Sequence, residues 1–176
     1  MAWRFLFNPD LCIGCRSCEI ACRNEFASQG SAQWRWLKEV SENSRTHYFL
    51  SLSCNHCENP ECVRVCPEKT YRKRKDGIVL HDPRLCSGCG KCTYACPFHV
   101  PKYSLLTGRV DKCNLCLHRL DNGLPAACVA ACPVNALGHL FPSEPDPIES
   151  CNSVLGFADV LITKPSIRFI RNIGKK

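Results

Sequence analysis

The sequence predicts an α+β fold of short strands, short helices and long loops, arranged around bound metal. Cysteine accounts for 17 of the 176 residues, far above its average usage. Most of these cysteines form four groups of four with similar spacing, which is an internal repeat. Short apolar runs precede the groups. We therefore expect covalent or metal links to hold the chain together as much as an apolar core does.

The predicted strands and helix lie next to the cysteine groups. We expect short strands at 3–7 ("WRFLF"), 47–53 ("HYFLSLS") and 77–81 ("GIVLH"), each ahead of a cysteine loop. The segment 17–27 ("SCEIACRNEFA") predicts a short helix. The segment 116–125 ("CLHRLDNGLP") predicts an irregular loop with a turn at its Asn-Gly pair.

Each cysteine group has two residues between its first two members and three between its last two, while the middle gap varies. The groups are Cys12, Cys15, Cys18 and Cys22; Cys54, Cys57, Cys62 and Cys66; Cys86, Cys89, Cys92 and Cys96; and Cys113, Cys116, Cys128 and Cys132. Cys151 lies outside every group.

This spacing is typical of ligands to 4Fe-4S clusters. A C-x2-C-x2-C loop wraps around a cubane and presents thiolates to three irons, and in bacterial ferredoxins a cysteine of another group, followed by proline, binds the fourth. Proline follows the last cysteine of three groups, and Arg23 takes its place after Cys22. One short helix is expected to reach two clusters, because the last two cysteines of a group lie about one helical turn apart. Gly14 and Gly88 are candidates for positive φ, or else ordinary turn glycines.

Other cysteine chemistries explain the pattern less well. Structural zinc typically takes two C-x2-C pairs and gives no reason for the further cysteines. Disulfides suit a secreted chain with an even cysteine count, whereas the count here is odd and "MAWRFLFNPD" lacks a secretory pattern. We therefore predict four 4Fe-4S clusters. Because every cluster corner then has a thiolate, we expect no active site in this chain itself.

The formal net charge of +7 would by itself suggest an anionic partner. Each cubane with four thiolates carries about −2 when oxidised, so four of them bring the assembled protein close to neutral. We therefore expect no nucleic-acid partner. No run of 18 apolar residues occurs, so we also expect no direct membrane span.

Several residues outside the groups have alternative interpretations. We interpret His56 as structural rather than as a ligand. Lys102 and Lys112 are expected to be exposed lysines, with a role in raising the potential of a nearby cluster as the alternative. Cys151 is expected to be a buried apolar residue.

The aromatic and basic segments are also ambiguous. Trp34 and Trp36 are expected in the core, with a partner contact as the alternative. The run 72–75 ("RKRK") predicts a solvated hairpin turn, or else a docking patch. The segment after Pro142 predicts an arm that lies on the domain or on a partner.

With these groups in place, the chain resembles the iron–sulfur subunits of dimethyl sulfoxide reductase and related molybdopterin oxidoreductases. The resemblance covers nearly the whole chain. It rests on "CIGCRSCEIAC", "SLSCNHCENPECVRVCP", "KDGIVLHDPRLCSGCGKCTYACPF", "KCNLCLHRLDNGLPAACVAACPVNAL" and "TKPSIRF".

The resemblance implies two nested ferredoxin-like domains. The outer domain would span 1–48 and 100–141, the inner one 49–99, and a C-terminal arm 142–176. The implied cluster ligands are Cys12, Cys15, Cys18 and Cys132; Cys113, Cys116, Cys128 and Cys22; Cys54, Cys57, Cys62 and Cys96; and Cys86, Cys89, Cys92 and Cys66.

The resemblance also implies a role in anaerobic respiration. Such a subunit relays electrons between a catalytic subunit that holds molybdenum or tungsten bis-pterin and a redox partner such as a quinone-linked membrane anchor. Alternatives are a subunit of a formate dehydrogenase, hydrogenlyase or tungsten aldehyde oxidoreductase complex, or a diffusible polyferredoxin. We expect a cytoplasmic location, or export in complex with a partner that carries the signal.

Overall fold

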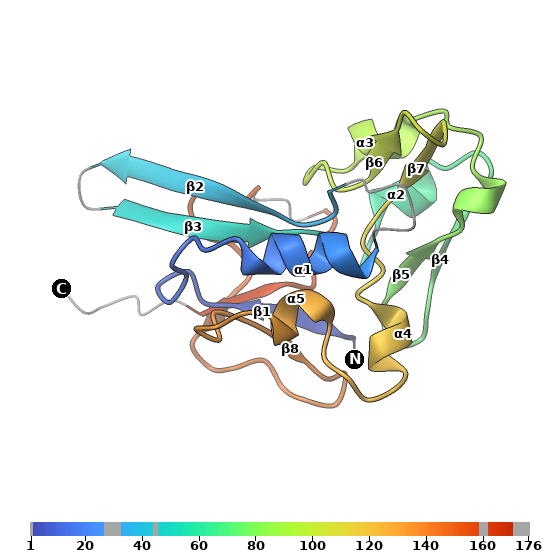
Figure 1. The fold of residues 1–176 in the computed structure, drawn as a ribbon. Helices are drawn as coiled ribbons and strands as arrows, with labels where there is room; N and C mark the ends of the chain where they lie inside the picture. Colours follow the sequence, from blue (N-terminus) through green and yellow to red (C-terminus); the bar gives the residue numbers. More distant parts are fainter. Residues whose placement is uncertain (1, 27–32, 44–45, 159–161, 171–176) are drawn as a thin grey trace.

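A four-stranded sheet joins segments from both ends of the chain (Figure 1). Its order is β8 (Leu137–Leu140), β1 (Arg4–Phe7), β10 (Arg168–Ile170) and β9 (Ser150–Cys151). β1 runs antiparallel to β8 and parallel to β10. The structure is a computed structural model, and it describes residues 2–26, 33–43, 46–158 and 162–170.

A long hairpin and two helices accompany this sheet. The hairpin consists of β2 (Trp36–Asn43) and β3 (Thr46–Leu52), and it extends away from the other elements (Figure 1). Helix α1 (Ser17–Glu25) packs against α5 (Ala127–Ala130). The buried side chains of Phe5, Phe7, Leu50 and Phe169 belong to one core cluster with several cysteine thiols. The apolar core is therefore continuous with the thiol-rich part of the molecule.

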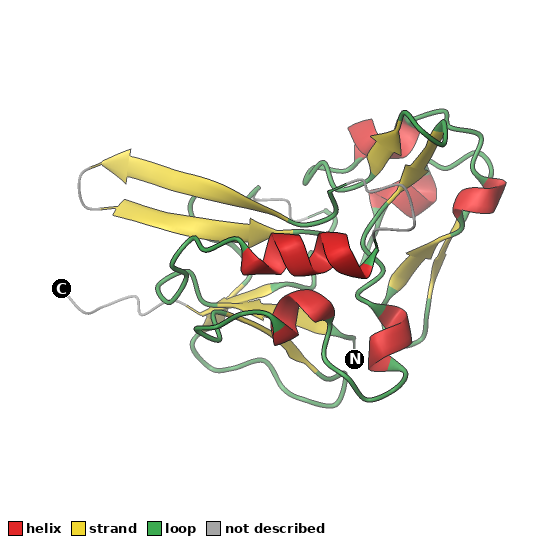
Figure 2. Cartoon of the chain, viewed as in Figure 1, coloured by secondary structure: helices red, strands yellow, loops and turns green. Residues whose placement is uncertain are grey.

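The remaining short elements gather on the other side of the molecule (Figure 1). They form two hairpins, two helices that pack together, a 3-10 turn and a separate helix. Their bounds are α2 (Glu61–Arg64), β4 (Tyr71–Lys73), β5 (Val79–His81), η2 (Pro83–Leu85), α3 (Lys91–Ala95), β6 (Lys102–Ser104), β7 (Arg109–Asp111) and α4 (Leu117–Leu120). Loops connect them over long stretches, as predicted (Figure 2).

The predicted strands and helix are confirmed as β1, β3, β5 and α1. Ala27, the end of the predicted helix, lies outside the described residues. The prediction for 116–125 is wrong in part, because α4 occupies its first half. Backbone hydrogen bonds from Leu120 to Cys116 and from Asp121 to Leu117 close this helix. It escapes prediction because four residues are too few to show a helical period. The turn that follows is present, with Gly123 at φ 72°.

The prediction of a hairpin turn at 72–75 is confirmed for its second half, because the first two residues lie in β4 and the turn begins at Arg74. The Arg74 amide donates to the carbonyl of Ile78, and the Gly77 amide donates to that of Arg74. The Arg74 guanidinium also pairs with Asp76 and with Asp121 beyond α4. The turn is therefore tied to the neighbouring loop.

The C-terminal segment joins the fold at several places, including its strand β10 and the residues just before it. Its strand β10 lies between β1 and β9 in the sheet. Just before it, 163–166 lie along the loop of the second cysteine group. The amides of Glu58 and Asn59 donate to Lys164 and Thr163 carbonyls, and Ser166 Oγ donates to the His56 carbonyl. This explains how "TKPSIRF" contributes to the fold, whereas the basic end at 171–176 lies outside the described residues.

Candidate metal centres

The four cysteine loops share one backbone feature. The second residue after the first cysteine of each group has positive φ, namely Gly14, His56, Gly88 and Leu115. This conformation directs an amide toward sulfur, as seen from Gly88 to Cys86 Sγ and from Leu115 to Cys113 Sγ, each 3.4 Å. The expected positive φ of the glycines is confirmed. The other two positions lack a glycine signal, and only alignment of the repeats would have found them.

The two glycines are also required by space. A Cβ on Gly14 would lie 2.6 Å from the Phe49 ring, and one on Gly88 would lie 2.2 Å from the carbonyl oxygen of Gly108. Both separations are below normal contact. The loops of groups one and three therefore pack too closely for a side chain at these positions.

The residue after the fourth cysteine decides how the chain continues. Where proline follows, the carbonyl of the fourth cysteine accepts a hydrogen bond from the amide three residues later. The residues that donate these bonds also have positive φ, and they are Lys69, His99 and Asn135. Arg23 follows Cys22 instead, and α1 continues to Glu25. Proline thus ends the helix immediately after the ligand candidate, because it cannot extend the helical hydrogen bonding.

All 17 cysteines lie in the described part of the chain, and each is a free thiol. Fifteen of them gather at four places, each combining cysteines from two groups. Cys89 is assigned to the fourth place by its spacing from Cys86 and Cys92. Burial raises the pKa of Cys12, and so does negative charge on Cys18, Cys132 and Cys15. Burial also raises the pKa of Cys22, with further contributions from Cys113, Cys128 and Cys116. These two sets lie close together in space.

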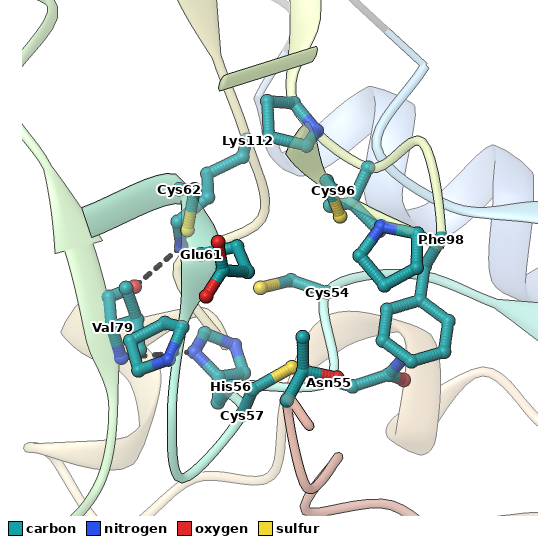
Figure 3. A pocket seen from close by; sticks show the side chains of 15 residues that line it. Cys54, Asn55, His56, Cys57, Glu61, Cys62, Val79, Cys96, Phe98 and Lys112 are labelled. Atoms are coloured by element: carbon teal, nitrogen blue, oxygen red, sulfur yellow. Dashed lines mark hydrogen bonds between the residues drawn. The ribbon is translucent and has the colours of Figure 1, made fainter. Parts of the chain in front are cut away.

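The other two sets belong to groups two and three. Cys54, Cys57, Cys62 and Cys96 line one cavity (Figure 3). Cys92 is close enough to Cys86 and Cys66 that their charges add to burial in raising its pKa. We name the sets site I (Cys12, Cys15, Cys18, Cys132), site II (Cys22, Cys113, Cys116, Cys128), site III (Cys54, Cys57, Cys62, Cys96) and site IV (Cys66, Cys86, Cys89, Cys92).

The four sites follow one another in space. Cys18 of site I is near Cys128 of site II, and Cys113 of site II is near Cys54 of site III. Tyr71 lies between the last two sites, near Cys62 on one side and Cys92 on the other. The order is therefore I, II, III, IV.

The arrangement of thiols fits clusters better than single ions. Among the described residues, which include every cysteine, no three His, Cys, Asp or Glu side chains are placed to hold one metal ion. The four thiols of site III instead line a cavity. A cubane needs such spacing, since its four irons occupy separate corners, whereas a structural zinc ion draws its ligands to one point.

A buried lysine lines the cavity of site III. Lys112 is 2% exposed, and its ammonium donates to the carbonyl of Cys113 at 2.9 Å and to that of Val79 (Figure 3). No described carboxylate pairs with it. The expectation of an exposed lysine is wrong here, because the residue that precedes Cys113 lies between sites II and III. Lys102 is half-buried, with its ammonium 4.7 Å from the Trp36 ring centroid.

A buried arginine accompanies site II. Arg35 is 2% exposed, and it donates to Ser51 Oγ at 2.8 Å and to Ser53 Oγ at 2.7 Å. Burial lowers the pKa of Arg35, but negative charge on Cys128 and neighbouring thiols raises it above its ordinary value overall. Sequence reasoning missed Arg35, because nothing in "QWRWLKE" distinguishes it from a surface arginine.

His56 is buried beside the same cavity as Lys112. Its Nδ1 accepts a hydrogen bond from the Val79 amide at 3.0 Å, which gives it a structural role. Its Nε2 is buried and has no hydrogen-bond partner among the described residues. Burial lowers the pKa of His56 well below its ordinary value.

The remaining candidates are a cysteine and two tryptophans that pack in or against the core. Cys151 is only half-buried, contrary to expectation, because it lies on β9 at the edge of the sheet, where its thiol contacts the Ser153 carbonyl at 3.2 Å. Trp34 is buried against Phe26, as expected for core packing. Trp36 is half-buried.

The two ends of the series of sites are open. Cys15 of site I and Cys89 of site IV are exposed. Large exposed apolar side chains occur in the same segments. They are Leu11, Ile13 and Ile20 around site I, and Leu85, Tyr94, Tyr103, Leu105 and Leu106 on the elements around site IV.

Two family models match the chain. Both are described as 4Fe-4S dicluster domains, and they cover residues 11–70 and 45–139. The first match contains cysteine groups one and two, and the second contains groups two, three and four. Within the described residues, no helix is long and apolar enough to cross a membrane.

The curated relatives have consistent descriptions. The B subunit of anaerobic dimethyl sulfoxide reductase from Escherichia coli is 37% identical over 76% of this chain and 70% of its own length. Thiosulfate reductase electron transfer subunit PhsB of Salmonella typhi is 44% identical over 79% and 77%. The B subunit of polysulfide reductase from Wolinella succinogenes is 36% identical over 97% and 88%. This chain therefore belongs to the family of 4Fe-4S electron-transfer subunits of molybdopterin oxidoreductases of the dimethyl sulfoxide reductase type.

Proposed function

We propose that the chain relays electrons through four 4Fe-4S clusters at sites I to IV, between a molybdenum- or tungsten-bis-pterin catalytic subunit and a second redox partner such as a quinone-linked membrane anchor. Each bound cluster accepts and releases one electron. The observation that carries this proposal is the unbroken series of four thiol sets, in which thiols of neighbouring sets approach each other or the same tyrosine.

The proposed ligands of each cluster are the four cysteines of its site. The nested domains follow from this assignment. Groups one and four would build the outer domain, 1–48 with 100–141, and groups two and three the inner one, 49–99. The packing of α1 on α5 and of α2 on α3 supports this division, since each pair joins groups that share sites.

The open ends supply the contacts with partners. Exposed apolar side chains near Cys15 and near Cys89 suit stable docking surfaces, because contiguous exposed apolar area commonly marks an interface. We propose that one partner docks at each end. This favours a fixed subunit over a carrier that exchanges freely among partners.

The substrate is set by the catalytic subunit. Relatives of similar identity are named for dimethyl sulfoxide, thiosulfate and polysulfide reductases. A chain with such relatives supplies electrons without contacting the substrate.

The ligand assignment is tested by paired cysteine substitutions in the anaerobically purified complex. Cys66→Ala and Cys86→Ala should remove the same electron paramagnetic resonance signal. Cys96→Ala and Cys54→Ala should each remove a second signal, the same one in both variants. Cys151→Ala should remove no signal. Loss of the same signal in Cys66→Ala and Cys54→Ala would contradict the exchange of ligands between groups.

Partner assembly is tested by purifying the tagged chain from its own cells. We expect a larger subunit containing molybdenum or tungsten to copurify, and the complex to resist moderate salt. A lone monomer that binds several reductases reversibly would instead identify a diffusible carrier.

A further inference from the structure

Site III is lined by a cation whose charge acts on the Asp111 carboxyl and on the Cys62 thiol, but which has no close ion pair among the described residues. The Lys112 ammonium uses two of its three N–H donors on the carbonyls of Val79 and Cys113. No described carboxylate lies within ion-pair distance of it, although the side chain is almost fully buried. A buried charge without a partner is strongly unfavourable. Glu61 also lines the cavity, but its carboxylate pairs with Arg64. The position of Lys112 in the same wall therefore indicates that the anion it faces belongs to the thiol set of the cavity.

A second donor faces the same cavity. The Val79 amide donates to His56 Nδ1, so that nitrogen carries no proton, and the proton of the neutral ring must lie on Nε2. Nε2–H is buried and has no partner among the described residues. In Figure 3 the imidazole lies beside Cys57 at the wall of the cavity. Its orphaned N–H therefore has an acceptor only if the cavity contains one.

The other three sites lack this combination among the described residues. Arg35 serves site II, but it already donates to two serine hydroxyls and lies near thiols of site I as well. The positions equivalent to His56 are glycine or leucine, which offer no side-chain donor. The residue before the first cysteine is lysine only in group four. Lys112 and His56 thus converge on one site.

We propose that Lys112 and His56 set the reduction potential of the cluster at site III, by charge and by a hydrogen bond to its sulfur atoms. This inference rests on the proposed function. Reduction adds one electron, supplied by a neighbouring cluster, and so adds negative charge inside a buried cavity. The ammonium and the N–H stabilise the reduced cluster more than the oxidised one, which raises the potential. Both residues tune the site without binding iron.

The test is a redox titration of the intact complex, followed by electron paramagnetic resonance. In Lys112→Met the ratio of reduced to oxidised cluster should fall at least about tenfold at a fixed potential, for one cluster only. This corresponds to a midpoint potential lower by about 59 mV for a one-electron step. His56→Leu should shift the same cluster in the same direction by less. Leucine suits this position because Leu115 occupies its equivalent in group four. Lys102→Met, at a lysine outside the cavity, should leave all midpoints unchanged.

Conservative variants separate charge from packing. Lys112→Arg keeps the positive charge and His56→Gln keeps an N–H donor, so both should return the midpoint toward that of the unaltered complex. The inference would be overturned if Lys112→Met and His56→Leu shifted the midpoints of two different clusters, or if neither shifted a midpoint while all four clusters were present. The proposed function would stand in both cases. Absence of 4Fe-4S signals from the unaltered complex would overturn both.

Discussion

The central sites II and III differ from the terminal sites I and IV in how their negative charge is accommodated. Each central site has a buried cation, Arg35 or Lys112. The terminal sites instead have an exposed cysteine, Cys15 or Cys89, among exposed apolar side chains. Buried cations therefore act mainly on the central sites, although Arg35 also acts on Cys18 of site I, and each end of the series has an exposed cysteine available for contact.

The largest effect is expected at the central cation Arg35. Arg35→Met would leave the charge of site II buried without a partner, and breaking a buried ionic contact in this way costs about 3–5 kcal/mol. We expect loss of the site II cluster and a lower urea midpoint, measured as iron content and by anaerobic unfolding. Arg84→Met is the control. Its pair with Asp82 is exposed to solvent, so this variant should leave the iron content and the urea midpoint unchanged. Full iron content in Arg35→Met would show that a central site does not need its buried cation.

The next effect is expected at a terminal loop. In Gly88→Ala the new side chain would be strained by the positive φ and would lie 2.2 Å from the Gly108 carbonyl oxygen. The free energy of unfolding should therefore fall by more than the about 1–2 kcal/mol that the strained φ costs alone. The site IV signal should weaken while the central signals persist. Gly123→Ala has a similar φ and open space around its Cβ, so it reports the strain alone. Equal destabilisation by the two variants would show that the close approach at Gly88 is unimportant.

A smaller effect is expected where the C-terminal segment holds site III. Ser166→Ala removes the hydroxyl that donates to the His56 carbonyl, which should lower the free energy of unfolding by about 1 kcal/mol. The site III cluster should become more sensitive to chelators than the others. Ser143→Ala, in a loop of the same segment, is the control. Uniform sensitivity of all four clusters would argue against a local anchoring role.

The smallest effect on stability is expected at the terminal surface. Leu105 and Leu106 are 92% and 84% exposed, so Leu105→Ser with Leu106→Ser should change the free energy of unfolding by less than about 0.5 kcal/mol. Iron content should be unchanged, while copurification of one partner should decline. Ile148→Ser, at an exposed residue of the loop that precedes β9, should leave partner binding intact. Undiminished binding by the double variant would place docking elsewhere.

Local features of the fold could be predicted from the sequence. Apolar runs predict β1, β3 and β5, and the residues between and after the first group's last two cysteines predict α1. The cysteine spacing also predicts which loops bind metal. These features depend on residues close together in the chain. Strands β2 and β10 were not predicted, because "WLKEVSEN" is largely polar and β10 is formed by only three residues that pair with distant β1.

The buried cations illustrate what the sequence could not reveal. Long basic side chains are usually exposed, and nothing in the sequence around Arg35 or Lys112 marks either as buried. Only the packing of distant loops brings them beside thiols of other groups. The spacing likewise does not say which group receives the last cysteine of another group. That pairing was implied by the family resemblance. The positive φ of His56 and Leu115 could be predicted only in part. Neither residue type favours it, but alignment of the four repeats places both at the position of Gly14 and Gly88.

The most direct test of the account is iron and sulfide analysis of the anaerobically purified protein in its complex, combined with electron paramagnetic resonance of the reduced protein. The account predicts about sixteen irons per molecule of this subunit, a matching amount of sulfide, and spectra in which neighbouring 4Fe-4S clusters are magnetically coupled. Colourless protein that contains zinc, or thiols joined as disulfides, would contradict it.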